Sequence, residues 1–225
     1  MFKIKCILIT IISIIISPDS INAQDIYLGI GGGYTKLCTN ELYTSDICKG
    51  GLGLKQGPHI CFRVKLGCEA LPFRTTGFIS SLHLNSNETF GKHFIPREVE
   101  ISSKILSYGL GIEYEIIFPF LSPYVFFNIN MNKFSKTSYR ESYSAATCPS
   151  CLSLARSISN ETRYGIAIGL GHEFYFFPKY GIDIYIKYES LNLIGKEDVK
   201  RYSQIFKEDN INTLSMSVNL YFRNK

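Results

Sequence analysis

The chain has 225 residues, a length that suits one domain, with 24 basic and 19 acidic residues and a formal charge of +5. The basic residues form no block and no basic helix, so the composition disfavours nucleic acid as a partner. Pro119 and Pro123 interrupt the longest apolar run after the N-terminus, IIFPFLSPYVFF. No later segment is therefore apolar over 18 residues, which excludes a helical membrane protein.

Residues 1–23 have the features of a secretory signal peptide. Lys3 and Lys5 precede the apolar run ILITIISIII, and a cleavage site follows Ala23. The apolar run is about half the ~20 residues that a transmembrane helix needs. We therefore expect export and a mature domain of residues 24–225.

Eight segments of the mature chain alternate between apolar and polar residues, which is typical of strands whose two faces differ. In GLGIEYEI (109–116), Leu110 and Ile112 lie on one face and Glu113 and Glu115 on the other. The eight predicted strands are residues 25–35, 58–68, 75–84, 104–118, 124–132, 162–177, 181–191 and 211–222.

The connections between these strands alternate between short and long. Short turns that contain Pro or Gly follow the second, fourth and sixth strands, and long polar connections follow the others. The long connections are predicted at about 36–57, 85–103, 133–161 and 192–210. A soluble domain rarely needs four long loops at one end. Bacterial outer-membrane barrels combine short periplasmic turns with long external loops.

Two features favour a barrel with its apolar face toward lipid. Aromatic residues are concentrated near the short turns, as at a membrane interface: Phe73, Phe118, Phe120, Tyr124, Phe174, Phe176, Phe177, Tyr180, Tyr221 and Phe222. The polar rows carry charges of both signs, which we expect to pair in a narrow lumen and leave no open pore. These residues are Arg63, Lys65, Glu113, Glu115, Glu173, Asp183, Lys187 and Glu189.

The joint pattern of strands, connections and a last strand, NTLSMSVNLYF, that ends at the aromatic Phe222 resembles one known family. Residues 25–222 are similar to the eight-stranded outer-membrane β-barrels, which include the transmembrane domain of outer membrane protein A. The resemblance implies an all-β, eight-stranded antiparallel up-and-down transmembrane β-barrel in the bacterial cell outer membrane.

The same resemblance implies what the protein contacts and does. The expected partners are outer-membrane lipid, the barrel assembly machinery during biogenesis, and an unknown surface ligand bound through the loops. The implied role is non-enzymatic, in envelope integrity or in surface binding and adhesion. No cofactor, metal or nucleic acid is expected.

Six cysteines remain after Cys6, in a compartment that is oxidising, and six cysteines allow 15 pairings. Cys61 and Cys68 lie in one predicted strand, roughly 23 Å apart at ~3.3 Å per residue, so they cannot bond each other. We predict that both stay thiols and that two disulfides form in the loops. The predicted pairs are Cys38–Cys48 and Cys148–Cys151.

Two alternatives remain open at this point. A secreted lipocalin-like ligand carrier would share the strand number and the export, but it would need a Gly-x-Trp motif, and the chain has no Trp. A lipid A-modifying enzyme needs a base beside a nucleophile at the outer leaflet. His83 and Ser81 lie at the outer end of the third strand, but the alternation predicts that both face the lumen. His172 lies near the periplasmic end. We therefore expect no catalytic residues.

Overall fold

The structure is a computed structural model that describes residues 24–39, 41–47, 51–68, 71–90, 97–116, 122–135, 137–141, 161–201 and 204–224. The strands and the short helix are β1 (Gln24–Leu37), α2 (Glu41–Thr44), β2 (Gln56–Cys68), β3 (Phe73–Phe90), β4 (Arg97–Glu115), β5 (Ser122–Phe134), β6 (Ser138–Glu141), β7 (Thr162–Phe177), β8 (Tyr180–Ile194), β9 (Asp198–Arg201), β10 (Gln204–Lys207) and β11 (Asn212–Asn224). In these ranges, no helix is long and apolar enough to cross a membrane. The predicted signal peptide lies outside them.

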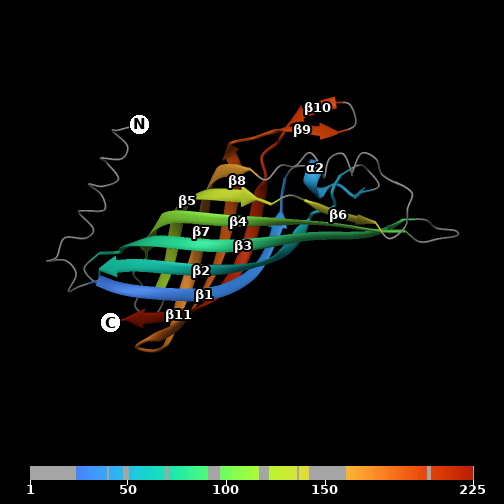
Figure 1. The fold of residues 1–225 in the computed structure, drawn as a ribbon. Helices are drawn as coiled ribbons and strands as arrows, with labels where there is room; N and C mark the ends of the chain where they lie inside the picture. Colours follow the sequence, from blue (N-terminus) through green and yellow to red (C-terminus); the bar gives the residue numbers. More distant parts are fainter. Residues whose placement is uncertain are drawn as a thin grey trace.

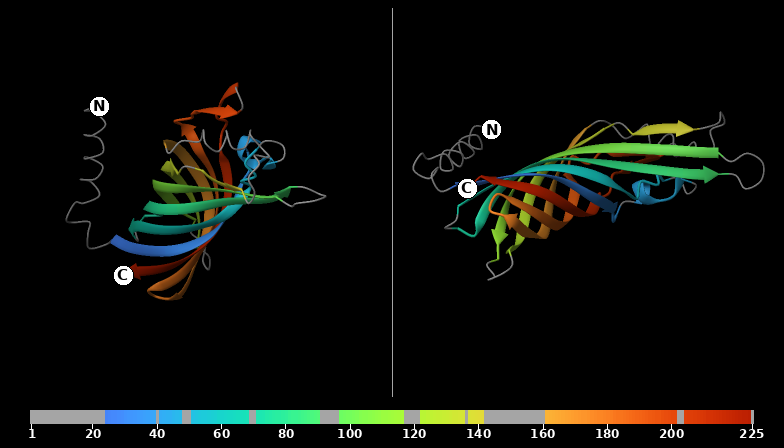
Figure 2. Two further views of the ribbon diagram at one scale, coloured as in Figure 1. Left: turned by 45° about the vertical axis from the view of Figure 1, so that its right-hand side comes forward. Right: turned by 90° about the horizontal axis from the view of Figure 1, so that it is seen from below.

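Eight long antiparallel strands close into one barrel (Figures 1 and 2). Their order is β3-β2-β1-β11-β8-β7-β5-β4, and the pairing of β3 with β4 completes the ring. The first and last strands pair from Ile26↔Asn224 to Leu37↔Thr213. Each predicted strand is found, so the predicted fold class is confirmed. The short strand β6 adds to β4 only, and β9 and β10 form a separate hairpin.

The expected loop at 85–103 is wrong, because this part of the chain extends the β3–β4 hairpin. The two strands stay paired as far as Phe90↔Arg97, and the hairpin projects past the neighbouring strand β2 (Figure 1). We call residues 84–90 and 97–103 the arm. The prediction failed because this part of the sequence is mostly polar, and the buried apolar residues Leu84, Val99 and Ile101 are too few to show a clear alternating pattern. The described elements of the other long connections, α2, β6 and the β9–β10 hairpin, lie at one end of the barrel, opposite the C-terminus (Figure 1).

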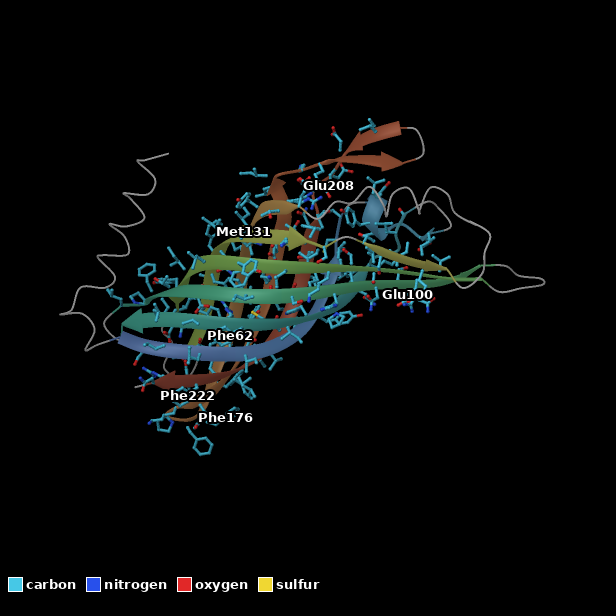
Figure 3. All side chains as sticks on the ribbon, in the orientation of Figure 1. Phe62, Glu100, Met131, Phe176, Glu208 and Phe222 are labelled. Atoms are coloured by element: carbon cyan, nitrogen blue, oxygen red, sulfur yellow. The ribbon has the colours of Figure 1, made fainter. Side chains whose placement is uncertain are left out.

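The outer face of the barrel is apolar and the lumen is polar. Leu110 and Ile112 are 68% and 58% exposed, whereas Glu113, the next residue along the strand, is fully buried. Exposed apolar side chains occur at alternate positions on all eight strands of the barrel, and together they form a closed apolar belt toward lipid. The lipocalin-like alternative is therefore wrong. Phe176 and Phe222 mark the short-turn end (Figure 3).

The aromatic residues near the short turns divide between the two faces. Phe73, Phe176 and Phe177 are more than half exposed, as expected of an interfacial girdle. Tyr124 and Tyr221 were predicted in the same girdle, but they face the lumen and are 1% and 5% exposed. Their hydroxyl groups suit the polar interior, as described below.

A second, apolar core closes the extracellular mouth of the barrel. The connection after β1 folds across the opening and buries side chains of α2 and of the segment that follows it against the upper ends of the strands. We call this group the cap core: Leu37, Tyr43, Ile47, Leu52, Leu54, Leu82, Leu84, Val99, Ile101, Ile105, Phe134, Leu191 and Ile211. Burial of these side chains holds the first loop and the arm in one packed unit.

Candidate functional site

Three cations and three anions form a network in the periplasmic half of the lumen. All six side chains are at most 5% exposed: Arg63, Lys65, Arg74, Glu113, Glu173 and Asp183. Lys65 Nζ lies 2.6 Å from Glu173 Oε1 and 3.2 Å from both Glu113 Oε2 and Asp183 Oδ2. The charges balance, and each cation has carboxylate partners from more than one strand. The arrangement therefore ties the wall of the barrel together and blocks the passage.

Arg63 and Arg74, the other two cations of the network, also contact carboxylates directly. Arg63 donates a hydrogen bond to Glu113 Oε1 at 2.7 Å, and Arg74 donates one to Glu173 Oε2 at 2.7 Å. Alternation along the strands produces this geometry, because Arg63 and Lys65 occupy successive inward positions of β2.

Aromatic rings fill the lumen between the charges. Tyr124 donates a hydrogen bond to Asp183 Oδ1 at 2.6 Å, and Lys65 Nζ lies 4.3 Å and 4.7 Å from the ring centres of Tyr124 and Tyr221. The Tyr124 ring lies over Gly171, where any Cβ would overlap it. Glycine at this inward position therefore provides the space that the ring needs.

The structure brings together five of the eight predicted lumenal charges and separates the other three. Lys187 and Glu189 form their own pair at 2.5 Å, and Glu189 also accepts a hydrogen bond from Asn130. Glu115 lines a polar cleft of about 300 Å³ at the periplasmic mouth. The sequence analysis missed Arg74, because the third strand was predicted to begin one residue later, at residue 75.

A hydrogen-bonded layer lies above the charges. His59 Nε2 lies 2.7 Å from Ser217 Oγ, and its Nδ1 lies 2.9 Å from Thr35 Oγ1. This juxtaposes a base and a hydroxyl, as in a catalytic dyad. However, His59 is 7% exposed, and the adjoining cavity measures about 10 Å³, at most the space of one water molecule. The pair therefore acts as a structural link between strands.

The cap contains a third polar group at its centre. The Arg163 side chain is fully buried, and its Nε donates to Glu208 Oε2 at 2.9 Å. Tyr43 donates to the other oxygen, Oε1, at 2.8 Å. Burial, with the charge of Glu208, raises the pKa of the Tyr43 hydroxyl well above its ordinary value of 10.0. The barrel is thus blocked at three successive levels.

Of the two cysteines whose side chains are described, Cys38 is exposed and Cys61 is a buried thiol. Cys61 was expected as a thiol. Cys48, Cys148 and Cys151 lie outside the described residues, so both predicted disulfides remain predictions. For Cys68 the structure describes the backbone, which pairs with Gln24.

The Ser81 and His83 side chains point out of the barrel, and the prediction that they face the lumen is wrong. His83 is exposed, and its Nε2 lies 3.4 Å from Ser81 Oγ. The error has a physical cause. At this height the cap core fills the lumen, so the inward positions Leu82 and Leu84 are apolar and the outward ones are polar. Among the described contacts, no carboxylate orients His83. His172 also faces outward and stacks edge-on against Phe174.

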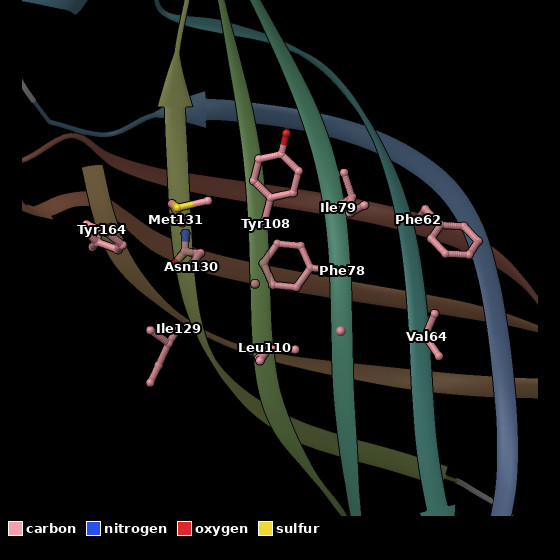
Figure 4. Close-up of a pocket in the computed structure, with 12 residues that line it drawn as sticks. Phe62, Val64, Phe78, Ile79, Tyr108, Leu110, Ile129, Asn130, Met131 and Tyr164 are labelled. Atoms are coloured by element: carbon pink, nitrogen blue, oxygen red, sulfur yellow. The ribbon is translucent and has the colours of Figure 1, made fainter. Parts of the chain in front are cut away.

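An apolar groove crosses the lipid-facing surface of β2 to β5 (Figure 4). It has a volume of about 610 Å³, and the side chains along it include those of Phe62, Val64, Ile79, Leu110 and Met131. The groove lies on the outside of the barrel, separate from the blocked lumen.

No protein-family model matches the chain, and no curated protein sequence matches it. Solved structures do show the same architecture. Neisserial surface protein A superposes with a TM-score of 0.50 at 11% identity, covering 88% of this chain and 96% of its own. A major outer membrane protein from Thermus thermophilus superposes with a TM-score of 0.54 at 9% identity, covering 90% of this chain and 100% of its own. At this level of identity the likeness concerns the fold. The chain therefore has the fold of the eight-stranded outer-membrane β-barrels.

Proposed function

We propose that this protein is a non-enzymatic, non-conducting surface-binding protein whose barrel anchors the arm outside the membrane. The blocked lumen supports the first part of the proposal, because ion pairs, hydrogen bonds and the cap core fill it in sequence. Contact with outer-membrane lipid and insertion by the barrel assembly machinery belong to the same proposal. The arm supplies the surface that would bind.

The free edge of β3 carries the proposal. Within the described residues, β3 pairs with β2 only from Gly67↔Arg74 to His59↔Leu82. Its later part pairs with β4 alone, as far as Phe90. A strand edge with unpaired backbone groups is a template for an added strand. An extended peptide would therefore bind by main-chain hydrogen bonds along this edge.

The orientation of the backbone identifies which residues would make those bonds. The His83 carbonyl oxygen lies against Gly57, on the β2 side of the strand. Backbone groups alternate between the two sides of a strand, so those of Asn85 and Asn87 also point to that side. The pairing of β2 with β3 ends at His59↔Leu82, so the N–H and C=O groups of Asn85 and Asn87 are the ones available for an added strand.

The arm is rigid enough to serve as such a template. Leu84 is 1% exposed, and Val99 and Ile101 are fully buried in the cap core. The opposite edge of the arm is already occupied, since β6 pairs with β4 from Val99↔Glu141 to Ser102↔Ser138. Little conformational entropy is therefore lost when a peptide is added at the free edge.

The test uses the barrel in lipid nanodiscs, panned against a phage-displayed library of random peptides. The variant Asn85→Pro/Asn87→Pro removes two edge donors without removing bonds to β4. The control Asn85→Gln/Asn87→Gln changes the side chains and keeps the donors. We expect enriched peptides that bind the wild type and the Gln variant and lose binding to the Pro variant. Peptides that bind the Pro variant equally well would refute strand addition.

Two further measurements address the alternatives. Planar-bilayer recordings should show no steady conductance, and an open pore would contradict a blocked lumen. The His83→Ala variant tests the lipid-enzyme alternative, because Ser81 and His83 face the lipid side. We expect the same lipid A mass profile in cells that carry the wild type or the variant. A difference between the profiles would refute the non-enzymatic role.

A further inference from the structure

Three basic side chains gather on the outward face at the extracellular end of the barrel. His83 and Lys104 are directly paired across β3 and β4. Lys133 on β5 is paired with Leu106, two residues from Lys104, so it lies diagonally adjacent. All three side chains are exposed, and none has an ion-pair partner among the described contacts. We call them the basic cluster.

The apolar groove begins just below the basic cluster and owes its depth to a glycine. Gly77 occupies an outward position of β3, between Val64 on β2 and Leu110 on β4. A Cβ at Gly77 would find only Leu110 Cδ2 nearby, at 3.6 Å. The missing side chain therefore leaves open space that the flanking apolar side chains border, as Figure 4 shows for Val64 and Leu110.

The basic cluster and the groove lie on the same strands. Met131 at the groove is two residues from Lys133, about 7 Å along β5 at ~3.3 Å per residue. Tyr108 at the groove is four residues from Lys104, about 13 Å along β4. A side chain of lysine spans part of this distance. The distance between the basic cluster and the groove suits a molecule with an anionic headgroup at the membrane interface and a hydrocarbon chain below it.

The opposite wall of the barrel lacks this combination. The outward residues of β11 from Leu214 to Leu220 are Leu, Met, Val and Leu, and those of β8 from Ile184 to Tyr188 are Ile, Ile and Tyr. At this end of the barrel, Lys36 on β1, which is paired with Leu214, is also exposed. Lys36 is not among the residues that line the groove, whereas the three residues of the basic cluster lie on strands that form it.

We propose that this face binds one outer-leaflet lipid with a phosphate-bearing anionic headgroup. The basic cluster holds the phosphate, and one acyl chain lies in the groove over Gly77. Lysine pairs with phosphate as a point charge, and the groove buries methylene groups of the chain against more protein surface than a flat wall offers. The site is independent of the peptide edge on the arm, so either proposal can fail without the other.

Native mass spectrometry of the barrel in neutral detergent tests this site. The probes are dioleoyl phosphatidylglycerol and dioleoyl phosphatidylcholine, each titrated separately, and inorganic phosphate, which is added to the complex with phosphatidylglycerol. We expect one phosphatidylglycerol to bind with clear preference over phosphatidylcholine, and inorganic phosphate not to compete. Equal binding of both lipids would overturn the headgroup assignment, and competition by phosphate would show a free-ion site instead.

Matched variants separate the two halves of the site. Lys104→Gln/Lys133→Gln should weaken phosphatidylglycerol binding about 30-fold, as expected for two interfacial lysines. Lys36→Gln, on β1 away from the groove, should have little effect. Gly77→Leu fills the groove and should weaken binding of both lipids. Val218→Phe adds a larger side chain on the outward face of β11, away from the groove, and should not weaken the binding of either lipid.

Each variant is first checked for the heat-dependent gel shift of a folded barrel. If Lys36→Gln weakens binding as much as the double lysine variant, the effect is general interfacial charge and the site is refuted. If folded Gly77→Leu binds as well as Val218→Phe, the groove holds no acyl chain.

Discussion

Lys65 holds the lumenal network together, and its removal gives the sharpest test of that network. Its ammonium group is fully buried and lies within 3.2 Å of three carboxylates. Lys65→Met leaves three anions facing two cations, Arg63 and Arg74. Removal of one partner from a buried ion pair costs about 3–5 kcal/mol, because an uncompensated charge remains in the interior. We expect this loss in the free energy of unfolding.

The assay is urea unfolding of the barrel in lipid vesicles, followed by tyrosine fluorescence, since the chain has no Trp, and by the heat-dependent gel shift. The double variant Lys65→Met/Glu173→Gln restores the charge balance, so it should be more stable than Lys65→Met alone. Lys55→Met is the control, since Lys55 pairs with Asp46 at the surface, where the two side chains are 56% and 36% exposed. A surface pair contributes about 0–1 kcal/mol.

Two results would refute the reasoning about Lys65. One is a loss for Lys65→Met that is no larger than the loss for Lys55→Met. The other is a double variant whose loss equals the sum of the two single losses, because additivity would show that Lys65 and Glu173 are not coupled.

Three further predictions concern other parts of the barrel. Tyr43→Phe removes the hydrogen bond to Glu208 and should lower the free energy of unfolding by about 1.5–3 kcal/mol at pH 8. The pKa of Tyr43 is raised in the folded protein, so the wild type's extra stability is complete below the unfolded pKa of about 10. In urea unfolding at higher pH this difference from the variant should shrink. A constant difference would contradict the assignment. Gly171→Ala should displace the Tyr124 ring and lower the free energy of unfolding in urea by about 1–3 kcal/mol; an unchanged unfolding midpoint would show that the ring moves freely. Cys61 is 3% exposed, so maleimide should label it only after heating, and labelling of the folded barrel would place it at an accessible surface.

The sequence by itself determined the barrel and the polarity of its two faces. Alternation with a period of two is a local property, and it marked each strand, including the outward row at Leu110 and Ile112 and the inward row at Glu113. The alternation of short and long connections set the direction of the strands in the membrane. These features can be recognised without tertiary contacts, because a strand's side chains alternate wherever the strand lies.

Only the tertiary structure decided what happens above the membrane and which charges meet. Leu84 and Val99 belong to strands because the first loop folds over them, and no local pattern shows that contact. At the upper end of β3 the cap core fills the lumen, so the inward side chains Leu82 and Leu84 are apolar and the outward side chain His83 is polar. Arg74 joins Glu173 through contacts between β3 and β7, which are not neighbours in the ring. The basic cluster and the groove likewise arise from the register between strands, which depends on how the whole ring closes.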